Sequence, residues 1–251
     1  MVVAYGKLIP PEVLALFPKG MLNLHPSLLP RYRGPSPIQS AILNGDHESG
    51  VTLMLLDPEM DHGPLLAHRV SPLSPHTRGS DLSNALADDG AKLLVDALPK
   101  YISGELTPHP QDHTRATFTK LLEREDGRID WRAAGAEQTE RMIRAYDLWP
   151  GTWTTWNKKR LKILRASLLH PTIGCANNAK PGYVFAPPLA PPQRGVEKSP
   201  LLFKDGLGVV LAVNCSPGSL ILEQLQPEGK KPLSASEFLR GSPKFMGSIL
   251  L

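Results

Sequence analysis

The pattern of apolar and polar residues divides this chain into a first part in which strand and helix patterns alternate and a second part dominated by short strand-like runs. In the first part, short apolar runs at 2–5 and 21–25 flank a segment at 10–18 that begins and ends with proline. This order predicts a strand, a short helix and a second strand. Short links between such elements are typical of a parallel α/β sheet, where ligands bind beyond the carboxyl ends of the strands.

The first part continues with a predicted helix at 36–45, a β-rich strand at 50–57 and a hairpin partner at 63–71. A long helix is expected over 78–104, where apolar residues recur at helical spacing up to a terminal glycine. No strand–helix repeat follows. The pattern therefore predicts an α/β domain over residues 1–108, followed by a polar linker over 109–134.

The second part has a different pattern. A helix over 135–151 precedes short strand-like runs separated by Gly, Pro and Asn, and a capped helical turn is expected at 234–241. The runs lie at 152–156, 160–169, 182–186, 208–213 and 219–227. Such spacing predicts a small OB-like β-barrel domain over 135–251, with a Pro-rich surface insertion at 186–200.

Charge supports this division. Residues 1–130 contain 12 Lys and Arg against 16 Asp and Glu, whereas residues 131–251 contain 16 against 8. The basic part either faces a polyanion or has a solvated basic surface, and charge alone leaves both interpretations open. The chain has no apolar run long enough for a membrane span. Its two cysteines, Cys175 and Cys215, have neither a metal-binding spacing nor a disulfide pattern.

The candidate chemistry begins at the second predicted strand. Asn23 and His25 are two residues apart in "MLNLHPSLLP", so their side chains share one face of the strand at its carboxyl end. An amide N–H and an imidazole N–H on one face can both donate to an oxyanion. Either residue alone is more often a turn-former than a catalyst, and the rigid turn that follows favours a site.

A third member is expected in the turn "LDPEMDHGPLL". Asp61 follows a buried strand, where a carboxylate can orient a neighbouring histidine. Asp57, Glu59 and His62 compete for the same role, and the turn amides offer these aspartates a purely structural one. The sequence contains no nucleophile elbow, P-loop or complete dinucleotide-binding fingerprint.

The stretch "NLHPSLLPRYRGPSPIQSAILNGDHESGVTLMLLDPEMDHGPLL" resembles the signature region of the 10-formyltetrahydrofolate-dependent formyltransferases. In that family, an Asn-x-His pair precedes a catalytic Asp by about 36 residues, as His25 precedes Asp61. The resemblance implies that Asn23, His25 and Asp61 are catalytic and that 10-formyltetrahydrofolate is the co-substrate, without a metal. It assigns the folate-binding segment to Ser27, Leu28, Leu29 and Pro30.

Within this family, "RYRGPSPIQ", "GRIDWRAAGAEQTERMIRAYDLWPGTWT" and "LQPEGKKPLSASEFLRG" resemble the branch that formylates initiator methionyl-tRNA. The resemblance implies a monomer without membrane contact that binds this tRNA and a folate. The residues that it assigns to tRNA binding are Arg31, Arg33, Lys158, Lys159, Arg160, Lys162, Arg165, Lys230 and Lys231. Without the resemblance, the cluster at 158–165 is interpreted more simply as an exposed basic strand.

Two alternatives stay open at this stage. One is a formyltransferase that acts on another amine, and the other is a noncatalytic RNA-binding remnant of the family. Because the chain opens with "MVVAYG" directly on an expected interior strand, we expect it to lack the first strands of the domain. The resemblance therefore implies that residues 1–108 are a partial Rossmann-like formyltransferase domain. The Pro-rich insertion favours a mitochondrial matrix protein over a bacterial cytoplasmic one, although no targeting signal is visible.

Overall fold

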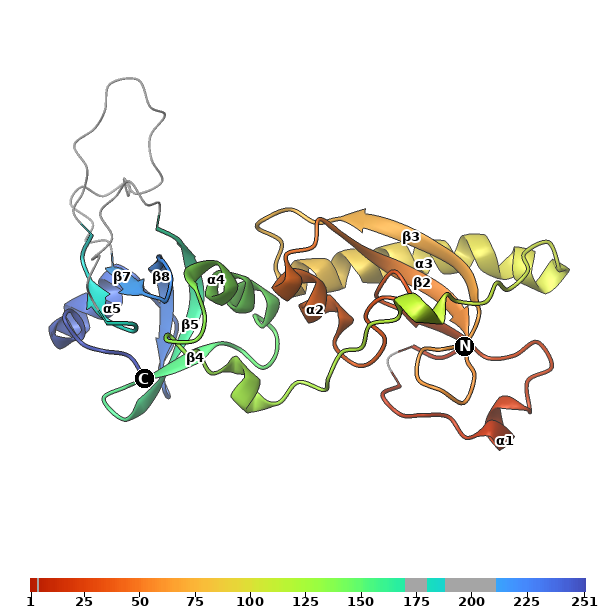
Figure 1. The fold of residues 1–251 in the computed structure, drawn as a ribbon, viewed down its shortest axis with the longest axis horizontal. Coiled ribbons are helices and arrows are strands. Elements are labelled where there is room, and N and C mark those ends of the chain that lie inside the picture. Colours follow the sequence, from red (N-terminus) through yellow and green to blue (C-terminus); the bar gives the residue numbers. More distant parts are fainter. Residues whose placement is uncertain (4, 170–179, 188–210) are drawn as a thin grey trace, which may run out of the picture. The chain divides into compact units, whose positions relative to one another are not determined.

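The computed structural model describes residues 1–3, 5–169, 180–187 and 211–251, which form two compact units, Met1–Glu123 and Arg124–Leu251 (Figure 1). Cys175, residues 188–200 of the expected insertion and the first part of the strand expected at 208–213 lie outside the described residues. Both predicted fold types are confirmed, because an α/β unit precedes a unit built mainly of curled antiparallel strands.

The first unit contains a three-stranded sheet in the order β1-β2-β3, with strands at Leu22–His25, Glu48–Leu55 and Leu65–Pro72. The hairpin between β2 and β3 is confirmed. The parallel sheet is not, because all three strands pair antiparallel. A parallel crossover returns the chain to the far end of the first strand. The connection from β1 to β2, which consists of the loop 26–36 and the helix α2 at Pro37–Asn44, instead starts β2 at the His25 end of β1. Parallel contacts in this unit are isolated bridges, one between Val2 and Asn23 and one between Arg33 and Phe118.

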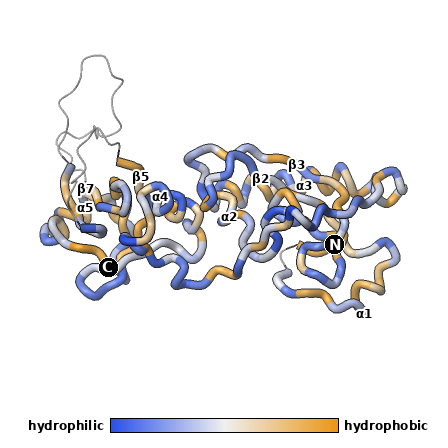
Figure 2. Tube along the Cα trace, viewed as in Figure 1, coloured by the Kyte–Doolittle hydropathy of each residue, from blue (hydrophilic) through white to orange (hydrophobic). Residues whose placement is uncertain are grey.

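Three helices accompany this sheet. They are α1 at Pro11–Leu14, α2 at Pro37–Asn44 and α3 at Gly79–Ser103. Helix α3 runs along β2 and β3, and its Leu93 and Ala97 pack on Val51, Leu53 and Leu66. In contrast, α1 has no buried residue, and several large apolar side chains of residues 1–17 are exposed. Figure 2 shows in orange the apolar stretches of the chain around α1.

The second unit is a six-stranded sheet in the order β4-β5-β8-β7-β6, with β9 paired to β8. The strands are Trp153–Trp156, Lys159–Leu168, Val184–Phe185, Leu211–Asn214, Ser219–Pro227 and Leu233–Ser234, from β4 to β9. Residues 247–251 connect the two edges, since Leu251 exchanges backbone hydrogen bonds with Thr155 of β4 and Leu250 donates to Gly182 next to β6. The last residues thus close the sheet into a barrel.

Two helices complete the second unit, α4 at Ala136–Ala145 and α5 at Ala235–Gly241. Helix α4 contributes Ile143 to the barrel core, and Phe238 of α5 packs edge to face on Phe245. The capping box expected at the start of α5 is present between Ser234 and Glu237. Within the described residues, no helix is both long enough and apolar enough to cross a membrane.

The stretch expected to link two bodies, 109–134, is divided between the units. His109 exchanges backbone hydrogen bonds with Leu65, and Arg33 does the same with the backbone at 117–119. Short 3₁₀ turns lie at His113–Arg115 and Arg124–Gly127. On the other side of the division, Ile129 donates to Trp153. The polar residues of 109–134 therefore belong to extended chain that forms backbone hydrogen bonds with each unit, whereas the sequence predicted a linker.

Candidate active site

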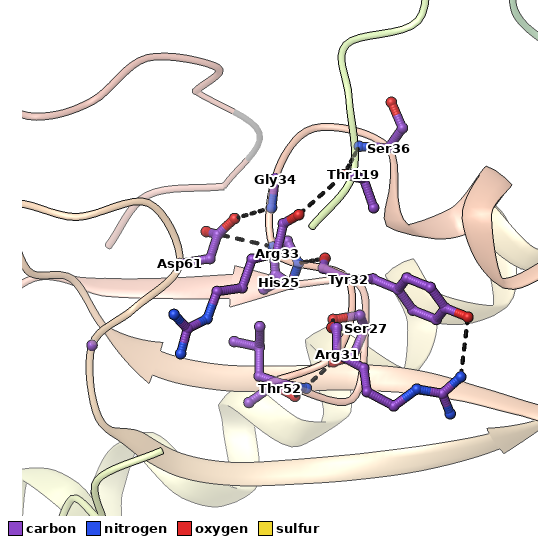
Figure 3. Close-up of polar contacts among 12 residues, drawn as sticks. His25, Ser27, Arg31, Tyr32, Arg33, Gly34, Ser36, Thr52, Asp61 and Thr119 are labelled. Atoms are coloured by element: carbon purple, nitrogen blue, oxygen red, sulfur yellow. Dashed lines mark hydrogen bonds and ion pairs between the residues drawn. The ribbon is translucent and has the colours of Figure 1, made fainter. Parts of the chain in front are cut away.

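The loop after β1 is held by its own polar groups (Figure 3). The Ser27 hydroxyl donates to the Arg31 carbonyl at 2.6 Å, and the Thr52 hydroxyl donates to the Ser27 carbonyl, also at 2.6 Å. Ser27 and Leu29 are buried, whereas Leu28 and Pro30 are partly exposed. Ser27 therefore stabilises the conformation of the expected folate-binding segment through its hydrogen bond to Arg31. Leu28 and Pro30 are the side chains of this segment that a ligand can reach.

His25 ends β1 and is buried between two acceptors. Its Nε2 atom lies 2.9 Å from the Tyr32 carbonyl oxygen, and its Nδ1 atom lies 3.6 Å from Asp61 Oδ1. Because a carbonyl oxygen only accepts hydrogen bonds, Nε2 must carry a proton. The distance to Asp61 is that of an ion pair and exceeds a hydrogen bond. Nδ1 is therefore the ring atom with room for another group.

Tyr32 is the residue that brings its carbonyl to His25. Its φ of 59° lies in the left-handed region, which is uncommon for a bulky side chain. The Tyr32 hydroxyl donates to Asp46 at 2.7 Å and accepts from Asn44 at 2.9 Å. Burial, partly opposed by the hydrogen bond from Asn44, raises the pKa of Tyr32. These contacts hold the ring and thereby the direction of the carbonyl.

The carboxylates that competed in the sequence occupy different places. Asp57 binds His62 Nδ1, and Glu59 is exposed. Asp61 faces His25 instead, and its Oδ2 accepts the Gly34 backbone N–H at 2.7 Å. Its φ of 50° turns it out of the extended course of the chain. The geometry thus brings Asp61 to His25 and assigns Asp57 to a separate pair.

Asn23 lies two residues before His25 on β1, so both side chains leave the same face of the strand. Its side chain is partly exposed and makes no hydrogen bond with a residue that the structure describes. The Asn23 amide can therefore donate to a bound group. No cluster of His, Cys, Asp and Glu among the described residues could hold a metal ion.

The two arginines after the "SLLP" turn differ from simple surface cations. Arg31 binds Asp46 at 2.9 Å. Burial disfavours its charge, but Asp46 and Tyr32 outweigh that effect, and the pKa of Arg31 is raised. Arg33 is buried, with 3% of its surface exposed, and its guanidinium donates to Gln111 Oε1 at 2.7 Å. This burial favours a role inside the site for Arg33 over contact with a tRNA phosphate.

Sequence reasoning missed two contributors to this site, the Tyr32 carbonyl and the Gln111 side chain. A main-chain carbonyl has no sequence signal, and Gln111 lies in a stretch that reads as a polar linker. Only the backbone pairing of residues 109–119 with the first unit places Gln111 beside the turn that carries Asp61.

The basic residues of the barrel lie on and beside β5. Lys162 and Arg165 pair with Gln226 and Gln224 of β8, so a bulge at Leu164 brings them to one face although they are three residues apart. Both are exposed. Arg160 lies over the Trp153 ring at 3.9 Å. The remaining basic candidates are exposed: Lys158 lies in the turn before β5, Lys159 begins β5, and Lys230 and Lys231 follow β8.

Comparison with known proteins agrees with this geometry. The family described as formyl transferase matches residues 1–98, and the formyl transferase C-terminal domain matches residues 121–243. A methionyl-tRNA formyltransferase of Roseiflexus castenholzii is 47% identical over 241 residues, which are 96% of this chain and 69% of that protein.

The chain belongs to the methionyl-tRNA formyltransferase family. A second methionyl-tRNA formyltransferase, from Myxococcus xanthus, is 38% identical over 248 residues, which are 99% of this chain and 71% of that protein. The chain thus spans about 70% of the length of both relatives. It is a formyl-transferring enzyme. Both relatives are bacterial, and nothing in them supports the expected mitochondrial location.

Solved structures confirm the fold. HypX from Aquifex aeolicus, crystallised in complex with tetrahydrofolic acid, aligns with a TM-score of 0.61 and 21% identity over 91% of this chain and 36% of that chain. An N-formyltransferase from Helicobacter canadensis aligns with a TM-score of 0.56 and 20% identity over 82% of this chain and 66% of that chain. At these identities, the likeness to both solved structures concerns the fold alone.

Proposed function

We propose that this enzyme transfers the formyl group of 10-formyltetrahydrofolate to the α-amine of initiator methionyl-tRNA. The observation that carries the proposal is the approach of His25 Nδ1 to Asp61 Oδ1 at 3.6 Å, beside an Asn23 amide on the same strand face. Relatives at 38–47% identity that are named methionyl-tRNA formyltransferases support the choice of acceptor. The fold shared with a tetrahydrofolate-bound protein supports the folate donor.

The reaction begins when the amine nitrogen attacks the formyl carbon. A C–N bond forms, and the formyl oxygen becomes the oxyanion of a tetrahedral intermediate. The Asn23 amide and a proton on His25 Nδ1 are the two donors available to this oxygen, because His25 Nε2 is occupied by Tyr32. Loss of one such donor costs about 10²–10³ in rate. The bond from the formyl carbon to N10 of the folate then breaks.

Asp61 is proposed to take part in the proton transfers of this reaction. The attacking amine must lose one proton, and N10 of the leaving folate must gain one. With its Oδ2 held by the Gly34 N–H, Asp61 directs its Oδ1 toward His25 and stabilises the protonated ring. Because both ring nitrogens of His25 then carry protons, the Asp61 carboxylate is the group of the pair that can accept the amine proton and return it to N10. Folate binding is assigned to Ser27, Leu28, Leu29 and Pro30, the loop next to this pair.

The barrel supplies the tRNA contact in this proposal. Lys162 and Arg165 form an exposed basic face on β5, and the exposed Lys158, Lys159, Lys230 and Lys231 near the start of β5 and after β8 add further positive charge to this unit. Lysine and arginine contacts to phosphates position a nucleic acid without reading its sequence. We assign initiator specificity to other parts of the complex.

Formylation assays test the proposal directly. The whole chain is mixed with methionyl-tRNA and 10-formyltetrahydrofolate, and formyl-methionine is measured at saturating substrates. We expect His25→Ala, Asn23→Ala and Asp61→Asn each to lower kcat by about 10²-fold or more. Asp96→Asn, which changes an exposed carboxylate on α3, is the matched control and should retain the parental rate.

Three results would contradict the proposal. Full activity of the His25→Ala variant would remove the proposed site. Binding of tRNA without formylation by the unchanged chain would instead favour a noncatalytic RNA-binding protein. Faster formylation of a small amino sugar or amino nucleotide than of methionyl-tRNA would assign the chemistry to another acceptor.

A further inference from the structure

The turn that carries Asp61 requires external support. Asp61 lies between β2 and β3 in neither a helix nor a strand, and its φ is 50°. The direction of its carboxylate toward His25 therefore depends on the path of residues 57–63. Catalysis is sensitive to such placement, because an error of 1 Å in the position of a reacting group can cost about 10² in rate.

Gln111 binds this turn from a distant segment of the chain. Its Nε2 donates to the Asp61 carbonyl at 2.9 Å and to the Gly63 carbonyl at 2.8 Å. The residue is buried, with 6% of its surface exposed. One amide thus fixes two main-chain carbonyls of the turn, one of them that of Asp61 itself.

Arg33 in turn holds Gln111. The Arg33 guanidinium donates to Gln111 Oε1 from Nη2 at 2.7 Å and from Nε at 3.3 Å. Its Nη2 also lies 2.8 Å from His113 Nδ1, on the segment of Gln111. The peptide that follows Arg33 supplies the Gly34 N–H to Asp61 Oδ2. Arg33 therefore contacts the Asp61 turn by two routes, through Gln111 to the carbonyl and through the next peptide to the carboxylate.

The charge of Arg33 makes this arrangement unusual for a structural contact. A buried guanidinium is normally paired with a carboxylate, because burial of an isolated charge is costly. Within the part of the chain that the structure describes, Arg33 has hydrogen bonds to a neutral amide and an imidazole, and no ion pair with a carboxylate. A folding role alone would be met at lower cost by an apolar side chain.

We propose that Gln111 and Arg33 are positioning residues for formyl transfer, which hold the Asp61 turn so that its carboxylate faces His25. The inference rests on the proposed catalytic role of Asp61. It assigns an active-site function to residues 109–113, which the sequence presents as a linker. It also gives Arg33 a role different from contact with tRNA.

Kinetics of Gln111→Met test this role, because methionine retains the length of glutamine and loses both hydrogen bonds to the turn. We expect kcat for formylation to fall about 30-fold, while KM for methionyl-tRNA changes less than threefold. Gln39→Met on α2, outside the site, is the matched control and should retain the parental kcat.

A double-mutant cycle separates positioning from general structural damage. If Gln111 acts through Asp61, Gln111→Met should lower kcat less than threefold in the Asp61→Asn background. An equal loss in both backgrounds would overturn the proposal, and so would unchanged kcat in the single variant. If the Asp61→Asn variant alone has the parental kcat, the proposed catalytic role of Asp61 is wrong, and the positioning role of Gln111 has no basis. The kcat of that single variant therefore distinguishes failure of the proposed function from failure of the positioning role.

Arg33→Lys and Arg33→Met provide a second route if Gln111→Met unfolds. Lysine keeps the charge but cannot donate twice to Gln111. We expect both variants to lower kcat at least tenfold while thermal unfolding of the Arg33→Lys protein stays within a few degrees of the parent. A parental kcat in Arg33→Lys, or a large loss of tRNA affinity with kcat unchanged in either variant, would overturn the positioning role.

Discussion

Residues of the same type have different roles in this site, because the groups around each of them differ. Asp57 and Asp61 lie four residues apart in one turn, yet the former binds His62 and the latter faces His25. Likewise, His25 differs from His62 because the Tyr32 carbonyl occupies its Nε2. A carbonyl contact fixes the protonation of a ring nitrogen, so the proposed chemistry depends on the backbone as much as on side chains.

Cys215 provides a prediction at the same scale. Burial, partly opposed by a hydrogen bond with Thr139, raises its pKa to about 12. Because a thiol of this pKa is almost entirely protonated at pH 8, we expect its alkylation by iodoacetamide to be at least about 100-fold slower in the folded than in the unfolded chain. Mass spectrometry of a Cys175→Ser variant measures the rate at Cys215 alone.

The pH dependence of stability follows with a definite sign. A raised thiol pKa means that the folded state retains the proton that the unfolded state loses. The contribution of Cys215 to stability is therefore complete below the unfolded pKa and decreases as the pH rises from about 9 toward 12. Similar alkylation rates in native and denatured protein would contradict this account.

At the scale of elements, close backbone contacts set the path of the catalytic loops. A Cβ atom at Gly63 would lie 2.1 Å from the Leu55 carbonyl oxygen, which is far inside van der Waals contact. Gly63 follows His62 in the Asp61 turn, and its own carbonyl accepts from Gln111. The turn can therefore lie against the end of β2 only with glycine at this position.

Gly63→Ala should displace the Asp61 turn. We expect a loss of about 1–3 kcal/mol in the free energy of unfolding, as for other overpacked sites, and a fall in kcat of at least tenfold. Gly241→Ala on α5 is the matched control, because a Cβ there meets no atom within 4 Å. Urea unfolding and the formylation assay measure the two effects, and a Gly63→Ala protein with parental values of both would refute the close contact.

On the scale of the whole molecule, charge separates the two units. The net charge is −4 for residues 1–130 and +8 for residues 131–251. The proposed catalytic residues all lie in the first unit, Met1–Glu123, and the exposed basic residues Lys162 and Arg165 lie in the second, Arg124–Leu251. This division fits chemistry on one unit and electrostatic capture of a polyanion on the other.

Salt dependence of tRNA binding tests the proposed division. Each phosphate contact contributes roughly −0.7 to −0.9 to the slope of log K against log salt. The double substitution of Lys162 and Arg165 by Gln should weaken binding and reduce this slope by about 1 to 2. Substitution of Lys92 and Lys100, exposed on α3, should leave the slope unchanged. Equal effects from both pairs would refute a dedicated basic face.

The sequence by itself predicted the helices at 36–45, 78–104 and 234–241, the β2–β3 hairpin and the two fold types. Hydrophobic period, caps and glycines are local, so they determine such elements without reference to distant residues. The spacing of Asn23, His25 and Asp61 could be counted along the chain, and it carried the family resemblance. The charge asymmetry between the two parts of the chain could also be counted directly.

Tertiary structure alone decided the direction of strand pairing, the closure of the barrel by residues 247–251 and the division of the expected linker. It also decided that Asp61, and not Asp57, faces His25, and that Gln111 and Arg33 reach the same turn. These features depend on hydrogen bonds between residues tens of positions apart. Local patterns contain no information on such approaches, because the packing of the complete fold brings the partners together.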